Sequence, residues 1–151
     1  MPYSATQVAN SFLSIAQANG EQLTNMQLQK LVYFAHGWHL ALTETPLIAE
    51  PVEAWPYGPV FSNLYGKLRQ YGNGTVTQPL PGGTIPAGGE KNLLEHVWQL
   101  YGHLSGPQMS FLTHKSNTPW DLCWKEQPFS TIPPALIREH FKELMKGPAN
   151  G

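Results

Sequence analysis

Residues 28–42 constrain the fold of this chain most, because they predict a helix that is apolar on nearly every side. An apolar stripe recurs there at helical spacing, and large hydrophobic side chains occupy most positions around it. The stripe consists of Leu28, Leu31, Val32, Ala35, His39 and Leu42, and it is surrounded by Tyr33, Phe34, Trp38, Leu40 and Ala41. A helix of this kind is usually buried among other elements. We therefore expect a globular domain with this helix at its centre.

The regions on either side predict further helices, about seven in all, in one domain that spans residues 1–151. Prolines exclude a regular helix over much of residues 43–60, where residues 52–55 favour a short strand, and residues 75–77 are a second candidate strand. From Val60 onward the apolar spacing is helical again. The expected fold class is mainly α: a single compact domain with a small antiparallel β-sheet, or α+β by a strict count.

Residues 78–90 are rich in proline and glycine and contain little apolar material. This composition is typical of a loop, and we predict that the segment is flexible. Too few residues flank it to form two domains with separate cores. We therefore interpret it as a loop within one domain.

Charge is sparse along the whole chain, and this disfavours several kinds of partner. Charged residues make up 13% of the sequence and the formal net charge is −1, whereas nucleic-acid binding depends on several lysine or arginine contacts to phosphates. The most apolar stretch, residues 31–42, is far shorter than the roughly 20 residues that span a membrane. A single cysteine, Cys123, permits no disulfide within the chain. We expect a cytoplasmic protein whose partner is neither nucleic acid nor a membrane.

Histidines are the main candidates for catalysis or metal binding, and they have little support. His36 and His39 have the spacing of two metal ligands on one helix, but no carboxylate or cysteine lies near them in the sequence. The chain also lacks the sequence patterns of a serine-hydrolase elbow, a phosphate-binding loop or a zinc-protease helix. We predict a protein without enzyme activity, catalytic residues, cofactor or metal. A metal-dependent hydrolase centred on His36, His39 or His114 is the alternative.

Large aromatic side chains beside prolines are the strongest candidates for binding. Trp55 and Tyr57 lie in a segment stiffened by prolines, and Trp120 directly follows another proline. Rigid aromatic side chains lose little entropy on binding and often anchor protein interfaces. They also serve as plugs that cover the ends of a helical domain. From the residues alone, both interpretations stay open.

Four blocks of residues, taken in order, resemble a known family. They are Leu28-Gln29-Lys30-Leu31-Val32-Tyr33 with Gly37-Trp38-His39-Leu40-Ala41, then Glu53-Ala54-Trp55-Pro56-Tyr57-Gly58-Pro59-Val60, then Leu112-Thr113-His114 with Pro119-Trp120, and finally Ile132-Pro133 with Ile137 and Phe141. Over about residues 6–145 this pattern is similar to the Panacea domain, the family of SocA-like and GepA-like antitoxins. The combination is specific, although each block alone is weak.

The resemblance implies a mainly helical domain from bacteria, their phages or other mobile elements. It implies an antitoxin that binds and neutralises a toxin protein, usually encoded beside it. One mode described for the family is delivery of the toxin to a ClpXP-type protease. A phage or mobile-element protein that binds a host factor is the second alternative to this function.

The resemblance also identifies family-signature positions in this chain. We expect the toxin to contact Tyr57, Asn63 and Lys67, together with Trp55 and Trp120. The signature residues for which we expect a structural role are Lys30, Tyr33, Trp38, His39, Gly58, Pro59, Thr113, His114 and Pro119.

Overall fold

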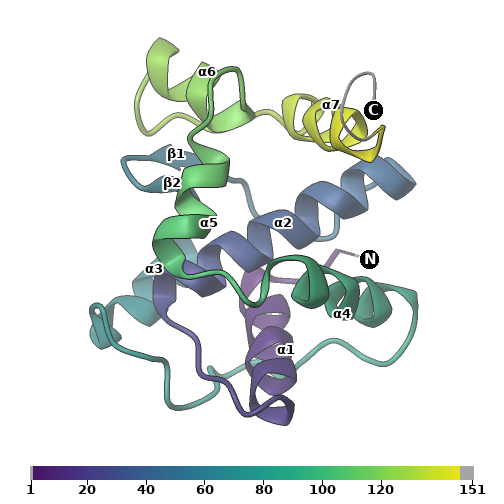
Figure 1. The fold of residues 1–151 in the computed structure, drawn as a ribbon, viewed down its shortest axis with the longest axis vertical. Helices are drawn as coiled ribbons and strands as arrows, with labels where there is room; N and C mark the ends of the chain where they lie inside the picture. The colour runs from purple at the N-terminus through teal and green to yellow at the C-terminus, as the bar shows by residue number, and fades with distance from the viewer. Residues whose placement is uncertain (1, 147–151) are drawn as a thin grey trace.

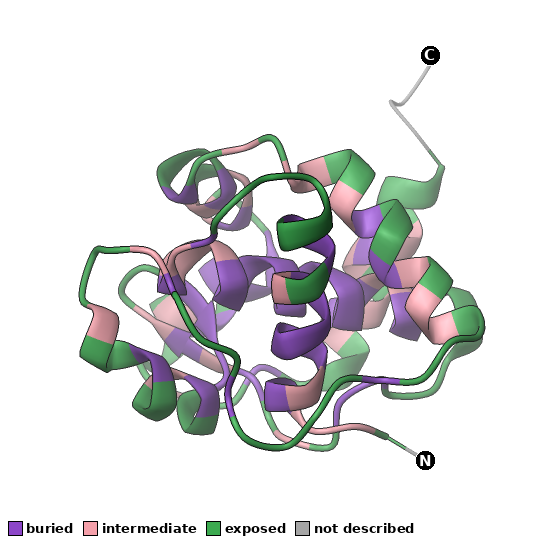
Figure 2. Cartoon of the chain, turned by 90° about the horizontal axis from the view of Figure 1, so that it is seen from below, coloured by how far each residue is buried: buried purple, intermediate pink, exposed green. Residues whose placement is uncertain are grey.

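The helix predicted at residues 28–42 forms the centre of the fold. The computed structural model describes residues 2–146, and in it this helix, α2, spans Asn25–Thr43 and crosses the middle of the molecule (Figure 1). The Thr24 hydroxyl accepts a hydrogen bond from the Gln27 N–H and the Gln27 side chain accepts one from the Thr24 N–H, so a capping box begins the helix. Most of α2 is buried, as Figure 2 shows. The central position predicted for this helix is confirmed.

Six further α-helices, one 3-10 helix and two strands complete the described part of the chain. They are α1 (Ala5–Ala18), β1 (Glu53–Trp55), β2 (Gly58–Val60), α3 (Ser62–Leu68), η1 (Arg69–Tyr71), α4 (Gly89–Tyr101), α5 (Gly106–Thr113), α6 (Pro119–Glu126) and α7 (Pro134–Met145). Of these, α1, α3, α4, α5, α7 and β2 all contact α2. The predicted fold class, a mainly α single domain with a small antiparallel sheet, is confirmed. Residue 1 and residues 147–151 of the predicted domain lie outside the described residues.

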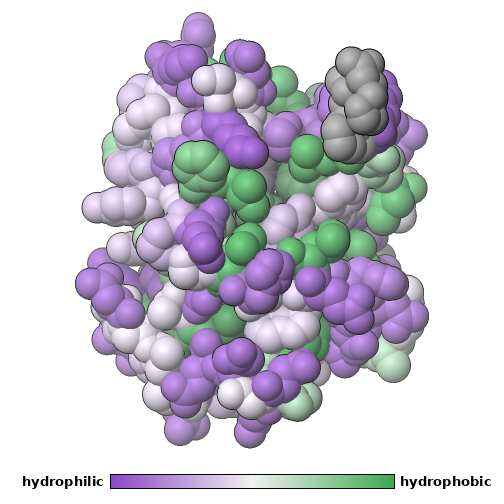
Figure 3. Space-filling model, in the orientation of Figure 1, coloured by the Kyte–Doolittle hydropathy of each residue, from purple (hydrophilic) through white to green (hydrophobic). Residues whose placement is uncertain are grey.

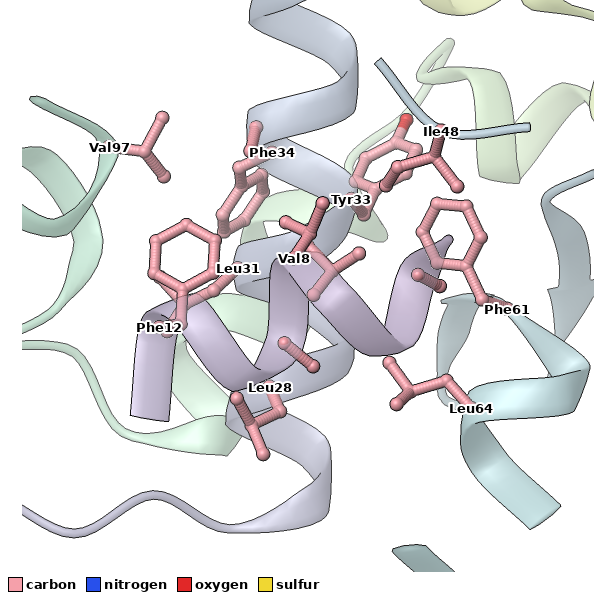
Figure 4. Packing of buried hydrophobic residues seen from close by; sticks show 14 of the residues in the cluster. Val8, Phe12, Leu28, Leu31, Tyr33, Phe34, Ile48, Phe61, Leu64 and Val97 are labelled. Carbon is pink, nitrogen blue, oxygen red and sulfur yellow. The ribbon is translucent and has the colours of Figure 1, made fainter. Parts of the chain in front are cut away.

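The core lies where α1, α3 and α4 meet the central helix. Val8 and Phe12 of α1 point toward Leu31 of α2, while Leu64 of α3 and Val97 of α4 close the cluster from two other sides (Figure 4). Each of these side chains is at most 1% exposed. Burial of one such side chain stabilises a fold by roughly 1.5–3 kcal/mol, so this cluster holds the helices around α2.

None of the helices in residues 2–146 combines the length and apolar character needed to cross a membrane.

The sheet differs from the prediction in its second strand. The expected first strand is confirmed as β1, but its antiparallel partner is β2 and not residues 75–77. Thr75 forms only an isolated bridge with Thr24. Val60, which we expected to begin a helix, is the last residue of β2, and α3 starts at Ser62.

The pairing of Ala54 explains how a proline enters this sheet. Pro59 lies opposite Ala54 and has no N–H to donate. The Ala54 N–H instead donates to the Ser130 carbonyl, and the Ala54 carbonyl accepts from the Phe129 N–H. The N–H and the carbonyl of Ala54 both point away from β2. The pairing with Pro59 therefore requires no N–H from the proline. The prolines therefore exclude a helix in this region, as predicted, but they do not exclude a strand.

The proline- and glycine-rich segment lies against α1. The Asn10 side chain accepts a hydrogen bond from the Leu80 N–H at 2.8 Å and donates to the carbonyls of Leu80 and Gly83. The Ile85 N–H donates to the Ser11 hydroxyl, and the Leu80 and Ile85 side chains are buried. The helix α4 begins at Gly89, so it includes the last two residues of the predicted loop 78–90. The flexibility of this segment stays a prediction.

Gly37 is expected to control the packing of α7 on α2. A Cβ atom at this position would overlap the ring of Phe141, which is 1% exposed and packs against the rings of Tyr33 and Trp38. We expect Gly37→Ala to lower the free energy of unfolding by about 1–3 kcal/mol, measured by chemical denaturation. The matched control is Gly66→Ala in α3, where no heavy atom lies within 4 Å of the added carbon and a gain of up to about 1 kcal/mol is expected. Equal stability of the two variants would contradict this packing argument.

Candidate functional site

The turn between β1 and β2 presents an aromatic side chain to solvent. Trp55 pairs with Gly58, so only Pro56 and Tyr57 form the loop of this hairpin. The Tyr57 side chain is 69% exposed. Gly58 has a φ of 122°, a value that residues with a side chain rarely adopt. A glycine at this position therefore allows the chain to turn sharply directly after Tyr57.

Side chains of α5, of His114 directly after it and of α6 contact the backbone carbonyls of three consecutive residues, Trp55, Pro56 and Tyr57. The Trp120 indole N–H donates to the Trp55 carbonyl at 2.6 Å, and the Ser110 hydroxyl donates to the Tyr57 carbonyl at 2.9 Å.

The ring of His114 lies against the carbonyl between these two, that of Pro56. Its Nε2 lies 3.1 Å from the Pro56 carbonyl oxygen and its Nδ1 lies 2.6 Å from the Ser110 carbonyl oxygen. These contacts with α5, α6 and His114 restrain the backbone of the turn. Such preorganisation reduces the entropy that a binding surface loses.

A continuous series of aromatic rings connects α3, the hairpin and α6. The ring centroids of Trp55 and Tyr65 are 4.9 Å apart, and those of Trp55 and Phe129 are 6.0 Å apart. Phe129 in turn lies 5.6 Å from Trp124, which stacks on Trp120 at 5.7 Å. Edge-to-face and stacked pairs of this kind contribute about 0.5–1.5 kcal/mol each. The series therefore stabilises the hairpin against α3 and α6.

Phe129 is an exposed aromatic residue with a strained backbone. Its φ is 65°, in the left-handed region, and its side chain is 57% exposed. A bulky residue in this region costs roughly 1–2 kcal/mol. The hydrogen bond from the Phe129 N–H to the Ala54 carbonyl, at 2.8 Å, holds this residue beside β1.

A lysine without a charged partner lies beneath the turn. Lys30 of α2 is 1% exposed, and a Cβ atom at Gly58 would lie 2.7 Å from its Cε and 3.0 Å from its Nζ. Within residues 2–146, no carboxylate lies within 4.0 Å of the Lys30 ammonium. Burial lowers the pKa of Lys30 from 10.5 to about 8. This ammonium is therefore a cost to stability at neutral pH.

The two histidines of α2, whose spacing is that of two metal ligands, each lie against a backbone group of the segment that follows the helix. His36 is 3% exposed and its Nδ1 accepts a hydrogen bond from the Ile48 N–H at 3.3 Å. Burial, with His39 nearby, lowers the pKa of His36 to about 4, so its ring is neutral at pH 7. His39 Nδ1 lies 2.7 Å from the Thr45 carbonyl. Among residues 2–146 no three histidine, cysteine or acidic side chains are grouped to share a metal ion.

The sequence matches the family described as antitoxin SocA-like, Panacea domain, over residues 28–121. These residues include most of α2, the β1–β2 hairpin and α5. The chain belongs to this family. It is 31% identical over 129 residues to Antitoxin SocA of Caulobacter vibrioides (strain NA1000 / CB15N), a match that covers 78% of this chain and 69% of that protein. No solved structure matches the chain.

The Panacea-domain signature residues with an expected structural role are mostly buried in this antitoxin-family fold. Tyr33 is 3% exposed and Thr113 is 4% exposed, and Pro119 starts α6. Trp38 is half-buried, where its indole N–H donates to the Tyr101 hydroxyl at 3.0 Å. These positions are compatible with a structural role, which stays a prediction.

The five residues expected to face the toxin differ in their accessibility. Tyr57, Asn63 and Lys67 are exposed, and Lys67 donates a hydrogen bond to the Thr6 hydroxyl of α1. Trp55 is half-buried, and Trp120 is 7% exposed beneath it. The structure joins Trp55, Tyr57 and Trp120 at one hairpin, whereas Asn63 and Lys67 lie on α3, whose Tyr65 contacts Trp55.

Our reading of the Panacea-domain sequence missed Ser110 and two exposed aromatic residues, Phe111 and Phe129. Residues two positions apart on a helix do not share a face, so an inward Met109 already implies an outward Phe111. No sequence pattern identifies Ser110, because its contact with Tyr57 joins residues 53 positions apart. The strained conformation of Phe129 is likewise set by its contact with β1.

Proposed function

We propose that this chain neutralises a toxin protein by direct contact and catalyses no reaction of its own. Its membership of the SocA-like antitoxin family supports an antitoxin role and a toxin partner. The single observation that supports this contact surface best is the immobilised turn that exposes Tyr57. Exposed, rigid tyrosines are frequent anchors of protein interfaces.

The proposed toxin-binding surface consists of Tyr57 with Asn63 and Lys67, and Trp55 contributes the part of its ring that is accessible. Trp120 is buried, so its proposed role is to support Trp55 through the bond to the Trp55 carbonyl. Asn63 and Lys67 extend the surface onto α3. The surface therefore combines one aromatic anchor with polar residues at its edge, as in many protein interfaces.

Two mechanisms follow from such a contact. In the first, the antitoxin covers the active surface of the toxin, and the purified proteins suffice for inhibition. In the second, it presents the toxin to a ClpXP-type protease, and inhibition also requires that protease and ATP. Both need the same primary complex.

The test uses the product of the reading frame beside the gene of this chain. Co-expression of the two proteins should restore growth to cells that the neighbouring product arrests, and the purified pair should form a complex by size-exclusion chromatography. A stable toxin level during rescue indicates covering of the toxin, whereas rapid toxin loss that requires ClpXP indicates delivery. If the two proteins neither form a complex nor show rescue, the proposed function is wrong.

A further inference from the structure

Two apolar hollows flank α5 on the face that Figure 3 shows. The larger, about 370 Å³, is lined by Leu104, Pro107, Gln108, Phe111 and Leu112. The smaller, 160 Å³, lies between α5 and α7, and Leu112 and Leu144 form part of its wall. Because Leu112 lines both hollows, they form one surface, which we call the α5 groove. The rings of Phe34 and Tyr101, stacked at 4.0 Å, also line the smaller hollow.

The α5 groove is continuous with the turn that carries Tyr57. Ser110 of α5 donates its hydroxyl to the Tyr57 carbonyl, and the next residue, Phe111, is 68% exposed. At the other end, Leu144 of α7 is 46% exposed. Figure 3 shows apolar residues gathered on this face over α5, α4 and α7. One partner that covers Tyr57 can therefore reach the groove.

The charges at the groove are of one sign. Lys115 lines the smaller hollow, and its ammonium lies 5.8 Å from the centroid of the Phe111 ring. Within residues 2–146, no carboxylate lies within 4.0 Å of this ammonium. Of the residues that the structure describes, no aspartate or glutamate lines either hollow. A partner segment that is apolar and carries a carboxylate complements this surface.

We propose that the α5 groove seats an apolar segment of the toxin, with one large side chain in the smaller hollow and a carboxylate beside Lys115. This inference rests on the proposed antitoxin function and specifies which part of the partner is bound. An apolar cavity of about 150 Å³ holds a benzene molecule, so the smaller hollow has the size for one phenyl ring or leucine side chain. Fully desolvated anchors of this kind dominate the energy of protein interfaces.

The first test blocks the smaller hollow. Leu144→Arg places a long charged side chain at its rim, and Met145→Arg is the matched control, because Met145 is 44% exposed on the same helix and does not line the hollow. Affinity for the product of the adjacent reading frame is measured by isothermal titration calorimetry. We expect at least a tenfold loss with Leu144→Arg and less than a threefold change with Met145→Arg. Thermal unfolding of both variants verifies that the fold is retained.

The second test addresses the charge. Lys115→Met keeps an apolar stem over Phe111 and removes the ammonium, whereas Lys115→Glu reverses the charge. We expect a three- to tenfold loss with Lys115→Met and a larger loss with Lys115→Glu. We also expect a weaker salt dependence of binding for Lys115→Met than for the parent chain, because exposed charge pairs are screened by salt. Unchanged affinity in both variants would contradict the carboxylate contact.

The outcomes separate this inference from the proposed function. If the neighbouring product binds and Tyr57→Ala weakens it, while Leu144→Arg and Lys115→Glu do not, the antitoxin function stands and the α5 groove is not the site. If the isolated chain forms a dimer that Leu144→Arg dissociates, with toxin affinity unchanged, a second copy occupies the groove and our inference is wrong. If the parent chain does not bind the product at all, both proposals fail.

Discussion

Replacing Lys30 by methionine is expected to stabilise the fold by about 3 kcal/mol at pH 7. The Lys30 side chain is 1% exposed, and burial lowers its pKa from 10.5 to about 8. A tenfold change in proton affinity corresponds to about 1.4 kcal/mol, so holding this ammonium charged in the folded protein costs about 3 kcal/mol. Methionine has a similar length, fills the same space and carries no charge.

The gain from Lys30→Met should depend on pH in a defined direction. Below pH 8 the lysine is protonated in both the folded and the unfolded chain, so the folded parent protein bears the full cost. Between about pH 8 and 10.5 the folded protein loses this proton while the unfolded chain keeps it, and the parent protein becomes more stable as the pH rises. The advantage of Lys30→Met should therefore be largest at pH 7 and vanish near pH 10.5.

The measurement is urea denaturation of both proteins between pH 7 and 10.5. Burial also raises the pKa of Tyr33, which lowers stability at alkaline pH, but this contribution is the same in both proteins and cancels in their difference. Lys115→Met, which removes an exposed ammonium, is the control and should change stability by less than about 0.5 kcal/mol. If Lys30→Met is less stable than the parent protein at pH 7, or if the difference in their free energies of unfolding does not change with pH, then Lys30 has a partner in solution.

Tyr57→Ala is expected to weaken toxin binding at least thirtyfold and to leave the fold intact. The side chain is 69% exposed, so its removal takes little from the core. Its backbone carbonyl keeps the bond from Ser110, because the substitution changes no backbone group. A central aromatic anchor contributes about 2 kcal/mol or more to an interface, which corresponds to this loss of affinity.

The controls for Tyr57→Ala separate the ring from its hydroxyl and binding from folding. Tyr57→Phe retains the ring and should bind within about threefold of the parent chain if the aromatic face makes the contact. Leu122→Ala removes an exposed apolar side chain of α6, 42% accessible, and should leave the affinity unchanged. Titration calorimetry gives the affinities and thermal unfolding gives the stabilities. Parent-like affinity of Tyr57→Ala would remove this turn from the proposed interface.

Several elements were predictable from the sequence because their causes are local. The capping boxes at Ser4 and Thr24 join residues three positions apart, and they begin α1 and α2 in the structure. The breadth of the apolar surface on residues 28–42 predicted the central position of α2, since no arrangement with one exposed face would bury it. The second strand escaped prediction because Pro59 fits only when Ala54 directs its backbone to residues 129–130, which lie far along the chain.

In the candidate site, too, some features were predictable from the sequence and others depend on tertiary packing. Trp55, Tyr57 and Trp120 were recognisable as candidate binding residues because each lies beside a proline. The α5 groove was not recognisable, because its walls come from α2, α4, α5 and α7. Hydrophobic periodicity in the sequence indicates which residues are buried. It does not report where two apolar surfaces fail to meet completely.

Sequence by itself determined the helices, their caps, the buried central segment and the family, since each depends on residues close in the chain or on the order of motifs along it. The tertiary structure alone decided that the side chains of Trp120, His114 and Ser110 lie against the backbone carbonyls of Trp55, Pro56 and Tyr57, across separations of 65, 58 and 53 residues. Contacts over such separations form only when the whole core has packed, because the entropy of closing a long loop must first be offset by burial elsewhere. Packing therefore decided which exposed residues have their backbone fixed by contacts with distant parts of the chain.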